Sequence, residues 1–287
     1  MVSCSDKAWL ALAGAGLERG HLTRRLIELA ECADKVLVET YTLPGSKWIV
    51  DELSRIVGGR VVEADRSALE DYAYTLLDEA RKERILVVTP GDPLIATTHR
   101  SLIPLARQMG VHVEIIPGIS GVCCAKTRSG LDYYLFGKTI TLPGPWRRVK
   151  PYSVLEGVAV NICSGLHTLL LLDIHPGTGD QLRPCEGLRM IQELEAEMGV
   201  EGFLDGIPFI LVDRACMEGE RVEATIGVEG VCGLDPPRGP ASLVVPGRAA
   251  RYELELLPIN VARVLQGWTP PTENACKLHP HLRTGVG

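Results

Sequence analysis

Three glycines stand close together near the start of the chain, in a pattern that suits close approach to a ligand. Gly14, Gly16 and Gly20 lie in the segment AGAGLERG, directly after a short apolar run. Glycine lets backbone N–H groups approach a bound molecule closely. The spacing is GxGxxxG, so the dinucleotide fingerprint GxGxxG is not met. Taken alone, the segment indicates a tight turn after a buried strand.

The segment TPGDPLIATTH (Thr89–His99) is the second candidate, and it carries a carboxylate that could position a ligand. Pro90 and Pro93 restrict the backbone around Asp92 and so hold its carboxylate in one place. On its own, the tripeptide GDP is more typical of a turn. The threonines could cap the next helix, and His99 could lie in the first turn of that helix with its ring nitrogens hydrogen-bonded. The eleven residues together are more specific than any part of them.

Three further segments place glycine, proline or polar residues at the ends of apolar runs. PGISGVCC (Pro117–Cys124) follows one such run, and DPPRGPASLVVPG (Asp235–Gly247) encloses another. GLHTLLLLDIHP contains an apolar run that His167 opens and Asp173 closes. These two side chains could bind a ligand, although capping of the strand is the simpler interpretation.

Apolar runs that alternate with amphipathic segments predict the elements that position these motifs. Over the first half of the chain the alternation indicates βαβ units and a mostly parallel sheet with right-handed crossovers. Ligands of such sheets bind outside the carboxyl ends of the strands, where the first three segments fall. The predicted strands are Ala8–Ala13, Lys35–Glu39, Arg84–Thr89 and His112–Ile116, and the predicted helices are Thr23–Cys32, Trp48–Val57, Ser67–Lys82 and Thr98–Met109.

The second half contains more strands than helices and predicts a mixed sheet with antiparallel edges. We therefore expect an α/β fold of two α/β domains, at residues 1–130 and 131–268. Residues 269–287 are rich in Pro, His and Thr, lack periodicity, and are predicted to be a disordered tail. The predicted strands are Lys138–Leu142, Thr168–Ile174, Pro208–Val212, Arg221–Gly227, Ala241–Val245 and Tyr252–Leu257, and the predicted helix is Leu188–Met198.

Composition excludes some classes of function. The formal charge of -6 argues against broad contact with nucleic acid, which needs a basic face. No segment approaches the roughly 20 apolar residues of a membrane helix. The nine cysteines show no CxxC pair and no zinc spacing, so no metal site is predicted. We expect reduced thiols in a cytoplasmic protein, with disulfides an alternative if the source is a hyperthermophile.

Taken in order, the motifs resemble those of the diphthine synthases, a branch of the tetrapyrrole methylase superfamily. The resemblance rests on AGAGL, TPGDPLIATTH, PGIS, HTLLLLDI and PASLVVPG, and covers roughly residues 8 to 260. TPGDPLIATTH discriminates best, because other members of the superfamily share the GDP turn but usually not the ATTH. The resemblance implies a cleft between two α/β domains in which S-adenosylmethionine binds, with S-adenosylhomocysteine as the product.

The same resemblance implies which residues contact the cofactor. The family commonly has a serine where Gly118 stands, an alanine near Asp213 and a histidine near Ala241, and contacts through the backbone would tolerate these differences. The matching positions are Leu17, Asp92, Ile95, Gly118, Ile119, Leu172, Asp213 and Ala241, with Pro240 an alternative to Ala241.

The implied reaction is methylation of the amino group of an aminocarboxypropyl-histidine on translation elongation factor 2, which gives diphthine. Family members are homodimers, so a homodimer is expected. The sulfonium methyl is already activated, so the enzyme mainly needs to orient the reactants and exclude water. An amine nucleophile must lose a proton, but the sequence does not identify the acceptor. Candidates are His99 and Asp92, of which Asp92 is expected to position the cofactor instead.

Three alternatives remain open at this stage. A methyltransferase of the same superfamily could act on a tetrapyrrole of the cobalamin or sirohaem pathway. A catalytically silent module could bind S-adenosylmethionine without turnover. A nicotinamide-dependent dehydrogenase is disfavoured by the glycine spacing, and we also expect no acidic residue at the end of the second strand, where such enzymes bind the ribose.

Overall fold

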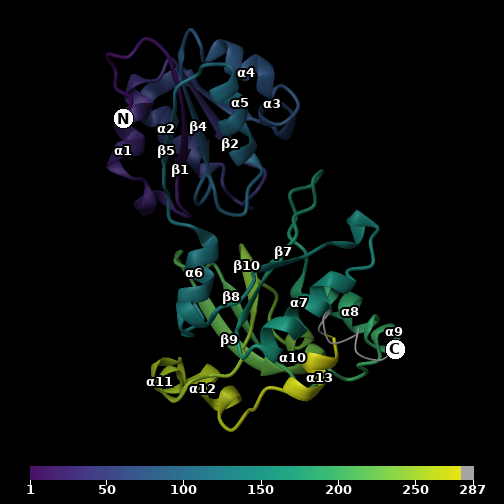
Figure 1. Cartoon of the computed structure of the whole chain (residues 1–287). Coiled ribbons are helices and arrows are strands. Elements are labelled where there is room, and N and C mark those ends of the chain that lie inside the picture. The colour runs from purple at the N-terminus through teal and green to yellow at the C-terminus, as the bar shows by residue number, and fades with distance from the viewer. Residues whose placement is uncertain (279–287) are drawn as a thin grey trace. The chain divides into compact units, whose positions relative to one another are not determined.

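The computed structural model describes residues 1–278, and the chain divides into two compact units, Met1–Gly121 and Val122 onward (Figure 1). This division falls after the first residue of helix α6 (Gly121–Arg128), nine residues earlier than the predicted boundary between 130 and 131. The predicted boundary, placed where the pattern of strands and helices changes, left the whole of this helix in the first domain. Instead, Lys126 lies over the rings of Tyr133 and Phe136, which belong to the second unit.

Unit 1 is a five-stranded parallel sheet of order β3-β2-β4-β1-β5. The prediction of a parallel sheet is confirmed. Alternate residues of β1 point to opposite faces, as the pleat of a strand requires. Trp9 and Ala11 pack with α1 and α2, whereas Leu10 and Leu12 pack with α3, α4 and α5. The strands are β1 (Trp9–Gly14), β2 (Lys35–Glu39), β3 (Val61–Ala64), β4 (Arg84–Thr89) and β5 (Val113–Ile116).

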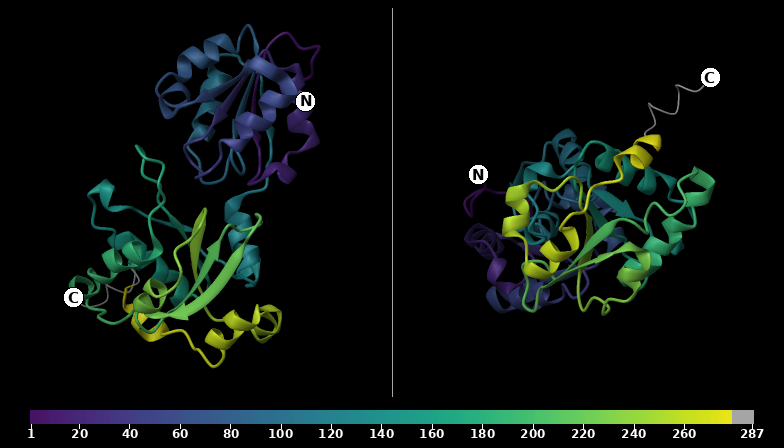
Figure 2. Two further views of the ribbon diagram at one scale, coloured as in Figure 1. Left: turned by 180° about the vertical axis from the view of Figure 1, so that it is seen from behind. Right: turned by 90° about the horizontal axis from the view of Figure 1, so that it is seen from below.

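Helices therefore cover both faces of this sheet, α1 and α2 on one and α3 to α5 on the other (Figures 1 and 2). Two predicted helices are shorter than expected. The segment predicted as Ser67–Lys82 forms two helices, and that predicted as Thr98–Met109 begins with a 3-10 turn at His99–Ser101. The helices are α1 (Arg24–Cys32), α2 (Trp48–Val57), α3 (Arg66–Leu69), α4 (Ala73–Glu79) and α5 (Leu102–Gln108).

Unit 2 is built on a mixed sheet of order β6-β7-β10-β8-β9, in which only β6 and β7 run parallel. The expected mixed sheet is confirmed. One apolar cluster joins this sheet to α7, α8, α10 and α13, while α12 packs against β8 and β9. The strands are β6 (Ile140–Leu142), β7 (Thr168–Leu172), β8 (Pro208–Asp213), β9 (Arg221–Ile226) and β10 (Ala241–Val245).

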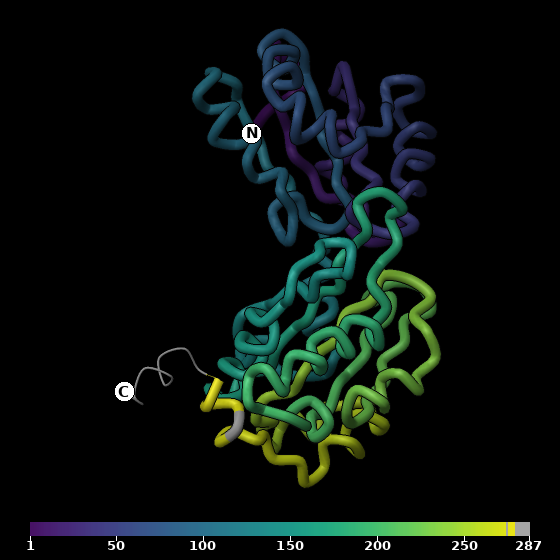
Figure 3. Tube along the Cα trace, turned by 90° about the vertical axis from the view of Figure 1, so that its right-hand side faces the viewer, coloured from purple at the N-terminus to yellow at the C-terminus, as the bar shows by residue number. Residues whose placement is uncertain are grey.

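The remaining helices of unit 2 are largely those that the sequence analysis missed. After β7 the chain forms a projecting turn around the bridge between Ile174 and Gln181 (Figure 3). The helices are α7 (Tyr152–Cys163), α8 (Pro184–Gln192), α9 (Glu195–Met198), α10 (Gly227–Cys232), α11 (Arg251–Leu256), α12 (Ile259–Leu265) and α13 (Thr272–Lys277).

The predicted strand Tyr252–Leu257 is wrong, because this segment forms α11. Its alternating apolar and charged residues imitate a half-buried strand. In the structure Glu253 is buried, and its carboxylate accepts from the backbone N–H of Ala250, at the start of the helix, and from that of Asp132. Because this charged residue is buried and hydrogen-bonded, it lies on the core side of the segment, whereas the alternating pattern placed it toward solvent.

The predicted disordered tail contains α13, which packs against α7 and buries Ala275 and Leu278. A disulfide between Cys163 and Cys276 joins the two helices. A six-residue helix has too few turns to show a period, so composition alone suggested disorder. The part of this prediction that concerns residues 279–287 lies outside the described residues.

The expectation of reduced thiols is also wrong, since six of the nine cysteines form disulfides. The pairs are Cys4–Cys32 in unit 1, and Cys163–Cys276 and Cys185–Cys232 in unit 2. Partners lie 28 to 113 residues apart, so no short spacing in the sequence could reveal them. Among the described residues, no helix is both long and apolar enough to span a bilayer.

Candidate functional site

The candidate site of unit 1 is a glycine cluster at the carboxyl ends of β1, β4 and β5. Gly16 and Gly91 exchange backbone hydrogen bonds of 3.1 and 2.8 Å, and so join the turns after β1 and β4. Both residues have positive φ, +73° and +69°, a region that glycine enters without strain. A Cβ on Gly118 would lie 2.0 Å from the Gly91 carbonyl oxygen and 2.7 Å from the Gly14 carbonyl carbon. The three turns therefore meet so closely that a Cβ on Gly118 would require backbone atoms of the neighbouring turns to shift.

The carboxylate of Asp92 stabilises this cluster through two hydrogen bonds. Its Oδ1 accepts from the backbone N–H of Leu94 at 2.9 Å, and its Oδ2 accepts from that of Gly118 at 3.2 Å. The sequence singled out Asp92 and Gly118 separately, and the structure brings them into contact. The carboxylate thus joins the turn after β4 to the turn after β5.

The apolar residues predicted for the same site divide into buried and exposed ones. Leu17 is buried, and its backbone N–H donates to Nδ1 of His21 at 3.2 Å. Ile95 and Ile119 are 39% and 40% exposed. These exposed branched side chains provide an apolar surface, and the glycine cluster beside them lets a ligand approach the backbone closely. An adenosine or thioether group requires both features, so the residues of this edge fit S-adenosylmethionine.

The predicted residues of unit 2 are cross-strand neighbours. Ala241 on β10 pairs with Asp213 on β8. The side chain of Gln181 joins β10 to β7, since its Nε2 donates to the carbonyls of Ala241 at 3.0 Å and Leu172 at 3.4 Å. Its Oε1 also accepts from the Ala241 N–H at 2.8 Å. Sequence reasoning missed Gln181, because nothing in a polar turn indicates that one amide will bridge two strands.

The carboxylate of Asp213 is fully buried and already has partners. Its oxygens accept from the backbone N–H groups of Arg238 at 3.0 Å and Gly239 at 3.2 Å. The guanidinium of Arg221 lies 3.5 Å away. A contact between this residue and a ligand would therefore be made through the backbone.

His167 and Asp173, for which capping of the strand was the simpler interpretation, both contact other segments of unit 2. Asp173 accepts from the indole N–H of Trp146 at 2.9 Å and forms an ion pair with Arg147 at 2.7 Å. This ion pair and backbone hydrogen bonds outweigh the effect of burial, so the pKa of Asp173 is lowered. His167 is buried against Glu253, and desolvation lowers its pKa despite that negative charge.

An acidic residue does end β2, contrary to the expectation stated for a dehydrogenase. Glu39 is fully buried, however, and accepts from the backbone N–H groups of Tyr41 at 2.8 Å and Thr42 at 2.7 Å. Because this carboxylate is fully buried, it is not accessible to the hydroxyls of a ribose, and the conclusion against a dehydrogenase therefore rests on burial and on the glycine spacing.

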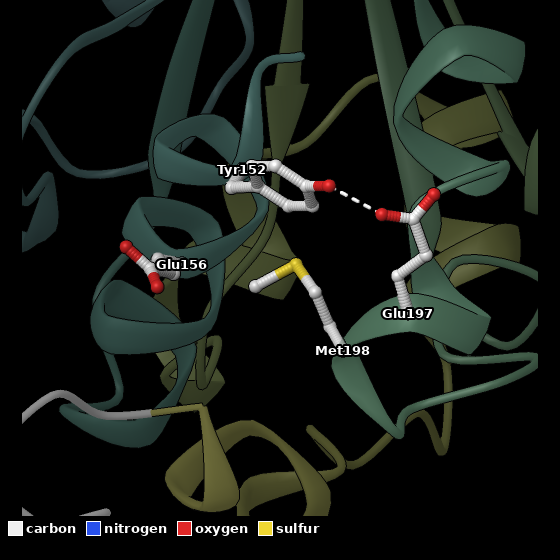
Figure 4. A pocket seen from close by; sticks show the side chains of 4 residues that line it. All are labelled: Tyr152, Glu156, Glu197 and Met198. Atoms are coloured by element: carbon white, nitrogen blue, oxygen red, sulfur yellow. Dashed lines mark hydrogen bonds between the residues drawn. The ribbon is translucent and has the colours of Figure 1, made fainter.

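One further pocket lies apart from these residues. It encloses about 450 Å³ in unit 2 and is lined by Tyr152, Glu156, Glu197 and Met198 (Figure 4). Glu197 accepts from the hydroxyl of Tyr152 and forms an ion pair with Lys150 at 2.7 Å. The pocket contains none of the predicted site residues.

Comparison with known proteins decides the family. The model of the tetrapyrrole (corrin/porphyrin) methylases matches residues 10–228. A diphthine synthase of Aeropyrum pernix is 40% identical over 253 residues, which cover 86% of each chain. The chain belongs to the diphthine synthases of the tetrapyrrole methylase family. It is therefore an S-adenosylmethionine-dependent methyltransferase.

Solved structures agree with this assignment to the diphthine synthases. A conserved hypothetical protein from Aeropyrum pernix K1 superposes with a TM-score of 0.86 at 36% identity, over 98% of both chains. A crystal structure of diphthine synthase superposes with a TM-score of 0.77 at 27% identity and covers 90% of this chain and all of that one. The two-domain α/β architecture of the family is thus established for this methyltransferase.

Proposed function

We propose that this methyltransferase methylates the amino group of the aminocarboxypropyl-histidine intermediate on translation elongation factor 2, to give diphthine. The observation that carries the proposal is the 40% identity to a diphthine synthase over 86% of both chains. The segment TPGDPLIATTH supports it, because its Asp92 holds the glycine cluster together. In this proposal the protein acts in the cytoplasm as a homodimer.

The proposed donor is S-adenosylmethionine, which leaves as S-adenosylhomocysteine. Its sulfonium supplies an activated methyl group, so the protein has to bind, orient and exclude water. In unit 1 the proposed contacts are made by the backbone at the glycine cluster and by exposed apolar side chains. In unit 2 they are made at the joined ends of β7, β10 and β8. The proposed contact residues are Leu17, Asp92, Ile95, Gly118, Ile119, Leu172, Asp213 and Ala241.

The decisive experiment is mass spectrometry of elongation factor 2 that carries the unmethylated intermediate, after incubation with this protein and S-adenosylmethionine. We expect mass gains in methyl steps on the modified histidine, and their number gives the end point of the reaction. The variant Asp92→Asn is expected to weaken cofactor binding. The NH₂ group of the asparagine is a donor, so it cannot accept the hydrogen bond that one carboxylate oxygen now accepts from the backbone N–H of Leu94 or Gly118.

A tetrapyrrole is the second candidate substrate, because the matching family model is that of the corrin and porphyrin methylases. The same incubation with a tetrapyrrole in place of the elongation factor separates the two. Calorimetry shows whether the cofactor binds. If it binds, and methyl groups are transferred to the tetrapyrrole but not to elongation factor 2, the substrate is the tetrapyrrole. Cofactor binding with no transfer to either would indicate a silent module.

A further inference from the structure

Two buried histidines of this chain each pair with a buried glutamate, and the two pairs differ at one atom. Nε2 of His99 lies 3.4 Å from Glu39, and Nε2 of His167 lies 3.0 Å from Glu253. The second nitrogen of His167, Nδ1, accepts from the backbone N–H of Gly247 at 2.8 Å. Nδ1 of His99 is equally buried but has no hydrogen-bond partner within residues 1–278. The first pair therefore has a hydrogen-bonding site that the second lacks.

Glu39 determines which nitrogen of His99 carries the proton. One carboxylate oxygen accepts from the backbone N–H groups of Tyr41 and Thr42, and the other accepts from the Thr42 hydroxyl at 2.7 Å. In all three contacts the carboxylate serves as the acceptor. The contact with His99 then requires a proton on Nε2, so the neutral ring has its free lone pair on Nδ1.

Other unpartnered polar atoms belong to the same region of unit 1. The hydroxyls of Tyr41 and Thr89 are buried and likewise have no partner among the described residues. The Tyr41 ring stands at 90° to the His99 ring, with centroids 6.3 Å apart. Burial, and then the charge of Glu39, raises the pKa of Tyr41, so it remains a hydroxyl donor. Unsatisfied buried polar groups commonly mark the position of an ordered water or of a ligand group.

This region adjoins the candidate site. Glu39 ends β2 and Thr89 ends β4, two neighbouring strands of the parallel sheet. His99 closes the loop that begins at Gly91 and carries Asp92. Within that loop Ala96 has a φ of 56°, a left-handed conformation that costs energy for a residue with a Cβ. Such strain is often retained at functional sites.

We propose that Glu39 and His99 form the proton-accepting pair of the methyl-transfer site, an inference that rests on the function proposed above. The substrate ammonium loses a proton to Nδ1 of His99, and the resulting imidazolium is stabilised by Glu39. The free amine then attacks the methyl group: the N–C bond forms, the C–S bond breaks, and its electron pair returns to sulfur. Because the ring is only 1% exposed, the proton passes through an ordered water held by the unpartnered atoms.

The charged groups beyond the pair are few. Arg66 lies over the Tyr41 ring, 5.2 Å from its centroid, and the charges of Glu70 and Asp65 act on the Tyr41 hydroxyl. Thr98, next to His99, donates to Glu70 at 2.8 Å. Glu39 is thus the carboxylate in direct contact with the ring among the residues that the structure describes.

The test compares His99→Asn and Glu39→Gln with His167→Asn, the matched variant of the pair whose nitrogens are both engaged. Methyl transfer to elongation factor 2 is measured at saturating cofactor, and the Kd of S-adenosylmethionine by calorimetry. We expect His99→Asn to lower kcat by about 100-fold with little change in Kd, as for loss of a general base. Glu39→Gln should lower kcat less, and His167→Asn should lower Tm while it keeps kcat.

Two results would overturn the inference. One is a folded His99→Asn variant that keeps most of its kcat. The other is a loss confined to cofactor affinity, because this would make the pair a structural support of the Asp92 loop. If His99→Asn does not fold, ¹⁵N spectra of the wild-type imidazoles decide: the neutral His99 ring should carry its proton on Nε2, and a proton on Nδ1 contradicts the proposal. If the wild type itself transfers no methyl group, the proposed function fails, and the spectra still test the pair.

Discussion

At the scale of single residues, the glycine cluster makes the sharpest prediction. In Gly118→Ala the new Cβ would lie 2.0 Å from the carbonyl oxygen of Gly91, and backbone atoms cannot move aside as a flexible side chain can. The turns after β4 and β5 must separate, which breaks the hydrogen bond from Gly118 to Asp92. We expect a loss of at least tenfold in cofactor affinity, about 1.4 kcal/mol, measured by calorimetry.

The control for this variant is Gly59→Ala, since a Cβ on Gly59 meets nothing within 4 Å. Both substitutions lower the entropy of the unfolded chain alike, so only the clash differs between them. Gly59→Ala should keep wild-type affinity. Equal affinity of the Gly118→Ala variant would mean that the cluster can relax and that its close contacts do not shape the site.

Residue-scale features of this kind were only partly predictable from the sequence. The family resemblance of the motifs identified Asp92 and Gly118, whereas the tripeptide GDP alone is more typical of a turn. They did not show that the two residues meet, which depends on the order of β4, β1 and β5 in the sheet. The importance of Gln181 and Glu39 was not predictable either, since each acts through partners that are distant in sequence or buried by the fold.

At the scale of elements, the pair of His167 and Glu253 joins β7 to α11 and makes unit 2 sensitive to acid. Burial lowers the pKa of His167 below its ordinary value of 6.5. Between that lowered pKa and about 6.5, the unfolded chain binds a proton that the folded one does not. This histidine's contribution to stability is therefore complete above pH 6.5 and declines as the pH falls through that window.

The variant His167→Gln cannot titrate, so it should unfold at a lower temperature than the wild type at pH 8. The difference should narrow as the pH falls from about 7 to about 5, because only the wild type loses the contribution of His167 there. Tm is measured by calorimetry across this range, with the exposed His112→Gln as the control. A difference between wild type and variant that stays constant with pH would contradict the assignment.

The same element shows why secondary structure was predicted well in unit 1 and less well in unit 2. The strands Lys35–Glu39 and Arg84–Thr89 and the helix Trp48–Val57 have the predicted bounds, since a parallel sheet covered on both faces makes long apolar runs. In α11 the pattern failed because Glu253 lies inside the protein. The hydrophobic period does not distinguish a charge that faces solvent from one buried against His167.

At the scale of the whole molecule, three disulfides crosslink segments that are distant in sequence. Cys4–Cys32 fastens the N-terminal residues to α1, Cys185–Cys232 joins α8 to α10, and Cys163–Cys276 attaches α13. In the chain-entropy account a crosslink stabilises more as the loop that it closes grows. The 113 residues between Cys163 and Cys276 correspond to about 4.8 kcal/mol, and the 28 between Cys4 and Cys32 to about 3.6 kcal/mol.

Reduction should therefore lower the Tm of the protein, and the link to α13 should contribute the largest single share of the loss. We expect Cys276→Ala to reproduce more of the effect of a reducing agent than Cys32→Ala does, in calorimetric scans with and without dithiothreitol. Cys124→Ala is the control, because Cys124 is not in a disulfide and burial raises the pKa of its thiol to about 12, which leaves it unreactive at neutral pH. Equal Tm values for the oxidised and reduced wild type would show that packing against α7 alone holds α13, and that the crosslinks contribute little to stability.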